Sequence, residues 1–408
     1  MLSTVSNGLL GSDFTWEDVN KIIEQKFGGA KLGDDTTIEP LAVGVGLQSL
    51  IGVVSTTWTD ENCPLPNKFV LKIGSPLALI KALKAQSGKI NMERSEELVR
   101  GFLIFLPLCH NSEIFFYENY ETLKKSGITE IPEFYFGSKI EKIAGGVSKG
   151  CIGMEFIEDV QSLSPAQDFS EEQLKQVLRV IARLEAAFLP LSTKIDAKTP
   201  HHGLAGLYQT FPDWFVLLNN KLMEQIPHPK MKHLTAEFAT TLPEIIKMQE
   251  IDRLEGKLGM QKVLVHGDLW SPNILWKGEH LEKIVDFQMI HFGMAVTDLS
   301  RIFNTALSPR QRRTKWREYL KYFHDVLTDE VGGERNLPYS YKQLELTYLL
   351  VYPRSSAMLL PTLTTVLDKV NTMPDNQEKH DLSMNLISKI IAIYEDVIDF
   401  HRNRPNYS

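Results

Sequence analysis

Two short apolar segments, Val263–Val265 and Leu281–Val285, enclose the stretch that most constrains how this 408-residue chain can fold. Both are short and rich in Val, Ile and Leu, which favours buried β-strands over helices. Between the segments and directly after them stand three polar residues, Asp268, Asn273 and Asp286. We predict that the two strands form one hairpin, and that this hairpin brings the three side chains together.

The residue types of this predicted hairpin suit transfer of a phosphoryl group from ATP to a hydroxyl group. That reaction requires a carboxylate to orient and deprotonate the acceptor, and oxygen ligands to hold Mg²⁺ against the phosphates. We assign the first role to Asp268 and the metal-binding role to Asn273 and Asp286. The alternative is an ordinary turn, in which Asp, Asn, Gly and Pro serve only the backbone conformation. The order of all three residues between apolar strands favours the functional interpretation.

The motifs of this segment resemble those of known phosphotransferases. His266 and Gly267 precede Asp268, and the spacing from Asp268 to Asn273 equals that of the protein-kinase catalytic loop, with Gly267 in place of an Arg. Together with D-F-Q and D-L-S-R further along, the sequence resembles aminoglycoside and choline phosphotransferases. It most resembles the choline-kinase-like group that includes ecdysteroid kinases and many uncharacterised nematode proteins. The resemblance implies an α+β, two-lobed, protein-kinase-like fold that uses ATP and Mg²⁺.

Composition limits the classes of partner and the cellular compartment. A chain with 43% hydrophobic and 23% charged residues can bury a large core and is long enough for two lobes. The net charge of −7, without a dense run of Lys and Arg, argues against a nucleic-acid or anionic-membrane partner. Three widely spaced cysteines indicate neither a disulfide framework nor a zinc site. We therefore expect a reducing, cytoplasmic location.

No segment of the sequence predicts insertion into a membrane. Met1–Asp13 lacks both a basic region and a long apolar region, so we do not expect a secretory signal. The run Gly101–Cys109 is too short to span a bilayer, and Leu346–Leu367 is interrupted by two prolines and an arginine. The sequence does not indicate an oligomeric state.

Residues 1–157 predict the smaller, N-terminal lobe. Thr15 and Asp18 resemble the capping box of a helix that continues to Phe27 and stops at Gly28. Runs rich in β-branched and apolar residues predict strands at 37–43, 50–58, 68–73, 131–136 and 151–157. The remainder is helical in pattern, including an insertion at 76–108 whose role the sequence does not disclose. We place the connection between the lobes near Met154–Glu158.

Residues 158–408 predict a larger and mostly helical C-terminal lobe. Ser170 with Gln173 resembles a capping box, and an apolar stripe from Leu174 to Leu184 indicates a long helix. Apart from the catalytic hairpin at 263–288, the later segments are helical in pattern. We expect these helices to bind the acceptor.

Under the functional interpretation, the first lobe should cover the nucleotide phosphates with a Gly-rich turn. Gly44 and Gly46 lie between the first two expected strands of the sheet, where glycines let backbone N–H groups approach phosphate oxygens. Ser49 occupies the sixth position, where protein kinases carry Gly. The alternative is a plain hairpin turn.

The strand around Lys72 resembles the strand of protein kinases that presents a lysine to the α- and β-phosphates. A solvent-facing lysine on an edge strand is the alternative. A helical carboxylate should orient Lys72. Glu113 fits the E-x-x-x-Y pattern of the resembling family, and Glu118 is the competing candidate.

The strand at 151–157 leads into the predicted lobe connection. We expect backbone groups from Glu155 to Ile157 to bind adenine, with Met154 packed against the base. An ordinary core strand is the alternative, because recognition by backbone groups leaves no side-chain signature.

Two residues after the hairpin also match the family pattern. The resemblance implies that Asp298 opens a helix and braces the catalytic loop, which is also compatible with a generic helix cap. We interpret Arg301 as a support or salt-bridge residue rather than a transition-state cation, since surface Arg is common. Glu185 stands where related phosphotransferases often carry His. The D-F-Q motif lacks the glycine of D-F-G and no A-P-E follows, so we do not expect regulation by an activation loop.

The sequence thus predicts an ATP- and Mg²⁺-dependent kinase acting on a hydroxyl of a small molecule, for which the resemblance admits sterol-, choline- and xenobiotic-like acceptors. A nucleotide-binding pseudokinase that serves as an interaction module remains an alternative, and a protein kinase is disfavoured by the missing motifs. Five aromatic residues could line the acceptor site, although a core position is the commoner fate of such residues. They are Tyr208, Phe211, Trp214, Phe215 and Trp270.

Overall fold

The computed structural model describes residues 7–41, 49–77, 80, 92–143, 146–192, 212–246 and 251–405, and only the backbone at 92–98, 146, 212–215 and 252. The chain forms two compact units. The first comprises Met1–Glu121 and Ile131–Asp159, and the second comprises Thr122–Glu130 and Val160–Ser408.

The segment Thr122–Glu130, which the predicted boundary at 157 placed in the first lobe, belongs to the second unit. The reason is its bonding. The backbone N–H of Ile284 donates to the carbonyl of Glu130 at 2.8 Å, and Arg183 forms an ion pair with the Glu130 carboxylate at 3.3 Å. The nucleotide-binding and acceptor-binding roles of the two units stay predictions.

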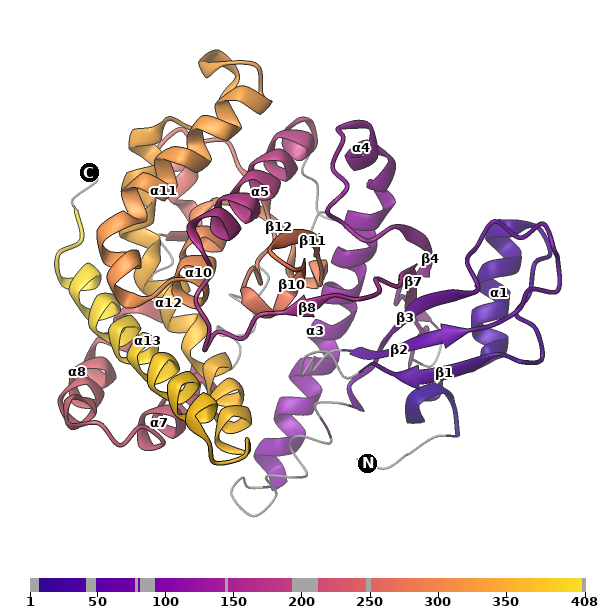
Figure 1. Cartoon of the computed structure of the whole chain (residues 1–408), viewed down its shortest axis with the longest axis horizontal. Helices are drawn as coiled ribbons and strands as arrows, with labels where there is room; N and C mark the ends of the chain where they lie inside the picture. Colours follow the sequence, from indigo (N-terminus) through magenta and orange to yellow (C-terminus); the bar gives the residue numbers. More distant parts are fainter. Residues whose placement is uncertain are drawn as a thin grey trace. The chain divides into compact units, whose positions relative to one another are not determined.

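The first unit is built around an antiparallel sheet of five strands in the order β1-β2-β3-β7-β4 (Figure 1). The strands are β1 (Thr37–Pro40), β2 (Ser49–Ser55), β3 (Lys68–Gly74), β4 (Phe134–Ser138) and β7 (Cys151–Glu155), and a separate small hairpin consists of β5 (Lys142–Ile143) and β6 (Gly146–Val147). The helices are η1 (Leu9–Gly11), which is a 3₁₀ turn, α1 (Trp16–Phe27) and α3 (Met92–Glu118). The boundary between the two units falls inside α4 (Tyr120–Lys125), after Glu121. All five predicted strands are present. β4 begins later than expected, after Pro132, which cannot donate to a sheet.

Helix α1 begins and ends at its predicted signals. Both hydrogen bonds of the capping box between Thr15 and Asp18 form, and Gly28 ends the helix in the left-handed conformation with φ 65°. The apolar face of α1 packs against the sheet, where Val19 and Ile23 share one core with Phe69 (Figure 1). Burial of each such side chain contributes about 1.5–3 kcal/mol, which fixes the helix on this sheet.

Helix α3 explains the E-x-x-x-Y pattern. Glu113 and Tyr117 are four residues apart and therefore lie on one face of the helix, and both are buried. The Tyr117 ring stacks on Phe134 of β4 with 5.4 Å between ring centroids, and its hydroxyl donates to the sulfur of Met154 at 3.7 Å. The aromatic residue thus attaches the helix to the sheet and places the carboxylate beside it.

The second unit is mostly helical, as predicted. Its helices are α5 (Glu171–Ser192), α7 (Pro212–Glu224), α8 (Pro229–Ile246), α9 (Leu254–Lys257), α10 (Val296–Ala306), α11 (Pro309–Glu330), α12 (Tyr341–Asn371) and α13 (Gln377–Arg402). Its strands are β8 (Gln161–Ser162), β9 (Val263–Val265), β10 (Ile274–Lys277), β11 (His280–Ile284) and β12 (His291–Gly293). Four 3₁₀ turns are η2 (Ile251–Arg253), η3 (Ser271–Asn273), η4 (Phe287–Met289) and η5 (Glu334–Asn336). The α+β prediction, with a small antiparallel sheet followed by helices, is confirmed.

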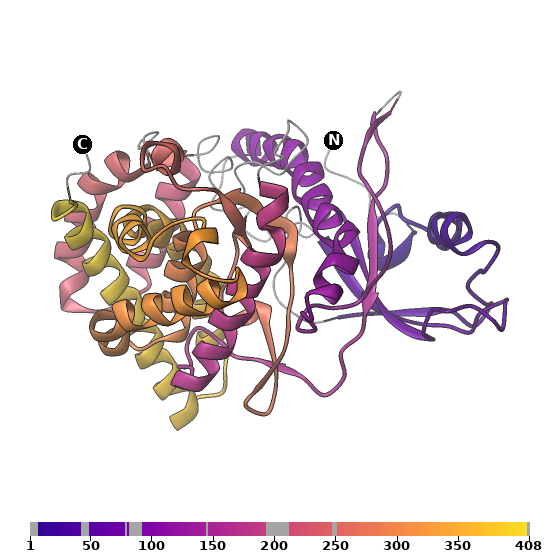
Figure 2. The ribbon, with the colours of Figure 1, turned by 90° about the horizontal axis from the view of Figure 1, so that it is seen from above.

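Helix α10 lies at the centre of the second unit. All its residues from Asp298 to Ala306 are buried, and it contacts α11, α12 and α13. In both views the orange and yellow helices α11, α12 and α13 lie side by side (Figures 1 and 2). The predicted capping box at the start of α5 forms as well, because Gln173 N donates to Ser170 Oγ at 3.2 Å. Within the described ranges, we find no helix with the length and apolar character needed to cross a bilayer.

Candidate active site

The predicted hairpin of Val263–Val265 with Leu281–Val285 does not form, because each segment pairs with another strand. β9 pairs with β12, and β11 pairs with β10, so Val263–Val265 and Leu281–Val285 are not neighbours in one hairpin. The strand β10 was missed in the sequence. It pairs with β11 through a two-residue turn in which Gly278 has φ 61°, and so short a connection costs less entropy than closing the longer loop from β9.

This local hairpin still brings Asn273 and Asp286 to the same end. Asn273 precedes β10 and Asp286 closely follows β11. The backbone N–H of Val285 donates to the carbonyl of Asn273 at 2.9 Å, which ties the two chain segments together beside the two side chains. The turn geometry therefore places an amide and a carboxylate, both with oxygen atoms of the kind that Mg²⁺ binds, on adjacent segments.

Asp268 lies on the loop that joins β9 to η3 and is held from two directions. The side-chain amide of Asn273 donates to the Asp268 carbonyl at 2.9 Å and to its Oδ2 at 3.3 Å. The backbone N–H of Asp268 donates to Nδ1 of His266 at 3.2 Å. The Asp268 side chain is 20% exposed, so the carboxylate is held in place and still reaches the surface of the unit.

Gly267 is required by a close backbone approach. It has φ 80°, and a Cβ at this position would lie 2.2 Å from the carbonyl oxygen of Met289. Protein kinases carry Arg at this position of the motif. Here the loop runs too near η4 for any side chain, which explains the departure from H-R-D.

Asp286 adopts an uncommon backbone conformation, with φ 69° and ψ 60°. Asp tolerates the left-handed region better than most residues, yet such outliers concentrate at functional sites. The Gln288 side chain donates to Asp286 Oδ2 at 3.2 Å. Because the Asn273 side-chain NH₂ is used on Asp268, the amide oxygen of Asn273 is left for a cation. The donor set of Asn273 and Asp286 therefore fits Mg²⁺.

Asp298 braces the loop before Asp268, as the family resemblance implied. Its two carboxylate oxygens accept the backbone N–H groups of His266 at 2.6 Å and Gly267 at 2.9 Å. The N-cap of α10 is Ala295, so Asp298 lies in the first turn of the helix and does not cap it. Burial lowers the pKa of His266. The neutral ring donates from Nε2 to the Val285 carbonyl at 3.1 Å, which leaves Nδ1 as the acceptor for Asp268.

Arg301 forms a salt bridge, as predicted, although the side chain is buried and not at the surface. Its side chain is 2% exposed, and its guanidinium Nη2 donates to Oδ1 of Asp268. Burial raises the pKa of Asp268, the neighbouring Asp286 acts in the same direction, and Arg301 opposes them. The sequence signal that pointed here was the D-L-S-R motif, in which Arg301 follows Asp298 by one helical turn.

In the first unit, Lys72 and Glu113 form a buried ion pair of 2.6 Å. Both side chains are 5% exposed or less. Lys72 is on β3, which lies between β2 and β7, so the alternative of an edge strand is wrong. Glu118 instead pairs with the exposed Lys139 at 2.8 Å. A lysine of the third strand paired with a helical glutamate is the arrangement of protein kinases, and together with the loop around Asp268 it confirms the predicted protein-kinase-like fold.

The other predicted nucleotide-binding residues are distributed as follows. Ser49 is buried at the start of β2, opposite Gly74. Gly44 and Gly46 lie outside the described residues. The backbone N–H of Glu155 donates to the Glu133 carbonyl at 2.9 Å within the sheet, and Ile157 follows in a half-buried position.

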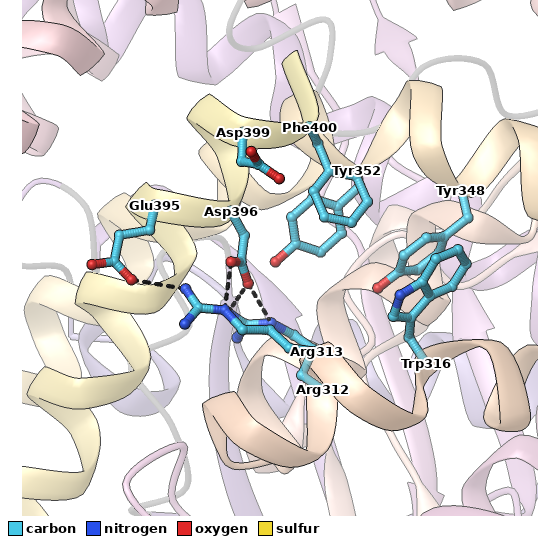
Figure 3. A pocket seen from close by; sticks show the side chains of 9 residues that line it. All are labelled: Arg312, Arg313, Trp316, Tyr348, Tyr352, Glu395, Asp396, Asp399 and Phe400. Carbon is cyan, nitrogen blue, oxygen red and sulfur yellow. Dashed lines mark hydrogen bonds and ion pairs between the residues drawn. The ribbon is translucent and has the colours of Figure 1, made fainter. Parts of the chain in front are cut away.

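The sequence did not foresee the pocket between α11, α12 and α13, which has a volume of about 420 Å³ (Figure 3). It is lined by Trp316, Tyr348, Tyr352 and Phe400, and by Arg312, Arg313, Glu395, Asp396 and Asp399. None of the five aromatic residues predicted for the acceptor site lines it. Trp270 is half-buried beside the catalytic loop, Tyr208 and Phe211 lie outside the described residues, and so do the side chains of Trp214 and Phe215.

Two Caenorhabditis elegans proteins are similar to this chain. An uncharacterised kinase-like protein is 24% identical over 399 residues, which cover 93% of this chain and 99% of that protein. A second, named "Uncharacterized oxidoreductase dhs-27", is 21% identical over 320 residues, which cover 74% of this chain and 36% of that protein. The name of the second protein therefore belongs to a chain of which the larger part lies outside the match.

Solved structures with a similar fold include two kinases of small amino alcohols. A choline kinase from Cryptosporidium parvum has a TM-score of 0.49 at 11% identity, with 88% of each chain covered. A Plasmodium vivax ethanolamine kinase has a TM-score of 0.40 at 14% identity, with 88% of this chain and 82% of that chain covered. The predicted similarity to uncharacterised nematode proteins is confirmed by the kinase-like relative. The profile of the family DUF1679, described as "Uncharacterized oxidoreductase dhs-27", matches residues 2–405, and the chain belongs to this family.

Proposed function

We propose that this protein transfers the γ-phosphoryl group of ATP, with Mg²⁺, to a hydroxyl group of a small molecule. One observation carries the proposal. The loop after β9 holds a partly exposed carboxylate, Asp268, against the amide of Asn273, and Asp286 directly follows Val285, whose backbone N–H donates to the Asn273 carbonyl. A base and two metal ligands within one short stretch are the parts that phosphoryl transfer requires.

The second unit would supply the base and the metal ligands. Asp268 Oδ2 receives only the long 3.3 Å hydrogen bond from Asn273, so this oxygen is suited to accept the proton of the acceptor hydroxyl. The Asn273 amide oxygen and the Asp286 carboxylate would hold Mg²⁺. The ion would neutralise charge on the phosphates, and the residues of this chain would orient the reacting groups.

The first unit would bind the nucleotide. The Glu113 carboxylate fixes the Lys72 ammonium group, which would then contact the phosphates. Gly44, Gly46 and Ser49 would provide backbone N–H groups for the phosphates. Because the N–H of Glu155 is already bonded within the sheet, recognition of adenine would fall to the backbone of Ile157.

The acceptor would be a small hydroxylated molecule, and choline-, ethanolamine-, aminoglycoside-, sterol- and xenobiotic-like compounds define the panel to test. The missing Arg before Asp268 and the absence of D-F-G and A-P-E from the sequence disfavour a protein substrate. We also propose that the protein acts in the cytoplasm, since its three cysteines are free.

The deciding experiment measures ATP consumption across this panel and identifies the product by the mass of one added phosphoryl group. We expect turnover that depends on both Mg²⁺ and one class of acceptor. Asp286→Ala should lose Mg²⁺-dependent nucleotide binding, measured by calorimetry with and without the metal. The exposed Asp375→Ala is the matched control. Nucleotide binding without turnover for any acceptor would instead establish the pseudokinase alternative.

A further inference from the structure

We infer that Arg301 is a positioning residue for Asp268, and that helix α10 holds the catalytic loop at two points, one through Asp298 and one through Arg301. The inference rests on the proposed function, because it assigns a role in presenting the base to the acceptor. It goes beyond that function because it assigns a role to a residue that would contact neither nucleotide nor acceptor. It also assigns different roles to the two carboxylate oxygens of Asp268.

The two contacts come from one face of α10. Asp298 and Arg301 are three residues apart, which places their side chains next to each other on the helix. Asp298 accepts the backbone N–H groups of His266 and Gly267, and Arg301 donates to the carboxylate of Asp268. One helix face therefore contacts three consecutive residues of the loop, two through the backbone and one through the side chain.

The helix that makes these contacts is itself fixed by polar contacts to α12. Ser300 Oγ donates to Ser355 Oγ at 2.7 Å, and the Asn304 amide donates to Ser356 Oγ at 2.8 Å. The Tyr352 hydroxyl donates to the side-chain amide oxygen Oδ1 of Asn304 at 2.8 Å. A site is held to within a fraction of an ångström only when its supporting residues are themselves locked by packing and hydrogen bonds. α10 meets that condition.

The burial of Arg301 indicates that this residue positions Asp268 and does not itself bind phosphate. The Arg301 side chain is 2% exposed and its Nη2 is used on Asp268, so the guanidinium is not presented to a ligand. Asp268 Oδ1 is occupied by Arg301, whereas Oδ2 holds only the long bond from Asn273. Arg301 thereby fixes the rotation of the carboxylate and leaves Oδ2 as the oxygen that faces the acceptor.

The test compares Arg301→Met and Arg301→Lys with Arg312→Met. Arg312 is the matched control because it is also 2% exposed and also paired with an Asp, Asp396, yet has no contact with the loop. We expect Arg301→Met to lower kcat roughly 100-fold, since a misplacement of about 1 Å costs that much, while KM for ATP stays within about twofold. Arg301→Lys should recover about tenfold of the loss, because it keeps a charged donor. Arg312→Met should retain the kcat of the folded protein.

Hydrogen exchange of the peptide 266–273 provides a readout that does not need activity. We expect faster exchange in Arg301→Met than in Arg312→Met, and Arg301→Lys serves if the Met variant does not fold. Equal exchange in both Met variants, an equal kcat in both, or a raised KM for ATP with unchanged kcat would each overturn the inference. A wild-type protein without turnover on any acceptor would refute the proposed function, and the exchange data would still decide whether α10 holds the loop.

Discussion

Among its described residues, the second unit buries two Arg–Asp ion pairs that share the same chemistry and differ in how many guanidinium groups the acid binds. In the first pair, Arg301 occupies one oxygen of Asp268, and the other oxygen keeps only a 3.3 Å bond to an amide. In the second pair, Asp396 Oδ2 accepts from Arg312 Nε at 3.2 Å, and its Oδ1 accepts from Arg313 Nε at 2.7 Å (Figure 3). Asp396 has guanidinium groups on both oxygens, whereas Asp268 does not.

Under the proposed function, this difference separates the acid that would accept a proton, Asp268, from the acid that joins two helices, Asp396. The Arg312–Asp396 pair joins α11 to α13, and Asp396 has no oxygen left for a substrate. The Arg301–Asp268 pair joins α10 to a loop, and the acid is 20% exposed against 10% for Asp396. A buried ion pair is weak evidence for stability by itself, so the spare oxygen is the more informative observation.

The largest effect should come from exchanging the acids for amides. We expect Asp268→Asn to lower kcat by roughly 10²–10⁴-fold, because general-base catalysis contributes about that much, and to leave nucleotide affinity within about twofold. Asp396→Asn, the matched change in the other pair, should leave the kcat of the folded protein unchanged. Steady-state kinetics and nucleotide titration measure both. Full activity in Asp268→Asn would refute its role as the base and remove the contrast between the pairs.

Removal of the Arg312 guanidinium group from the Arg312–Asp396 pair should lower the stability of the protein and leave its turnover unchanged. We expect Arg312→Met to lower the free energy of unfolding by about 3 kcal/mol, because removing one partner leaves a buried charge without full compensation. Urea denaturation measures this change. Arg310→Met, at an exposed position on the same helix, is the control and should have little effect. If both variants are equally stable, the Arg312–Asp396 pair does not hold α11 to α13.

A third ion pair, Lys72–Glu113 in the first unit, extends the comparison to the nucleotide. We expect Glu113→Gln to lower kcat/KM for ATP about tenfold, which corresponds to the loss of about 1.4 kcal/mol of charge-assisted bonding to Lys72. Glu118→Gln, which removes the partner of the exposed Lys139, should leave kcat/KM unchanged. Equal kinetics in the two variants would show that the buried pair does not act on the nucleotide.

The smallest effect should come from Glu185, a buried acid that has no cation among its described contacts. Glu185 accepts a hydrogen bond from the Tyr339 hydroxyl at 2.6 Å, and burial raises the pKa of Glu185 well above its usual 4.5. The folded state therefore keeps a proton that the unfolded state loses above pH 4.5, so stability falls as pH rises from 4.5 toward the folded-state pKa.

We expect Glu185→Gln to remove this decline. The variant should be more stable than the wild type at pH 8 and equally stable near pH 4, because it has no carboxyl group whose protonation differs between the folded and unfolded states. Thermal unfolding at a series of pH values measures the difference. Parallel pH profiles for the two proteins would show that Glu185 does not carry a buried proton.

Local signals were sufficient for elements whose decisive contacts lie within a few residues. The capping box of Thr15 and Asp18, the stop at Gly28 and the start of α5 at Ser170 were predicted because those hydrogen bonds span three or four residues. The neighbourhood of Asp268 and Asn273 was predicted for the same reason, since only five positions separate them. The partner of β9 was predicted wrongly. Which strands pair depends on all the strands nearby, and β10 was not recognised as a strand.

The sequence by itself determined the α+β architecture, the five strands of the first sheet, the mostly helical character of the second unit and the residue types of the loop around Asp268, because all of these follow from hydrophobic periodicity and short-range hydrogen bonding. Only the tertiary structure decided that Lys72 pairs with Glu113 and not Glu118, that Arg301 is buried against Asp268, and that β11 pairs with β10. The partners Lys72 and Glu113 are 41 positions apart, and Asp268 and Arg301 are 33 apart. Burial and pairing at such separations depend on how whole helices and strands pack. No local sequence pattern determines which of several charged residues becomes buried.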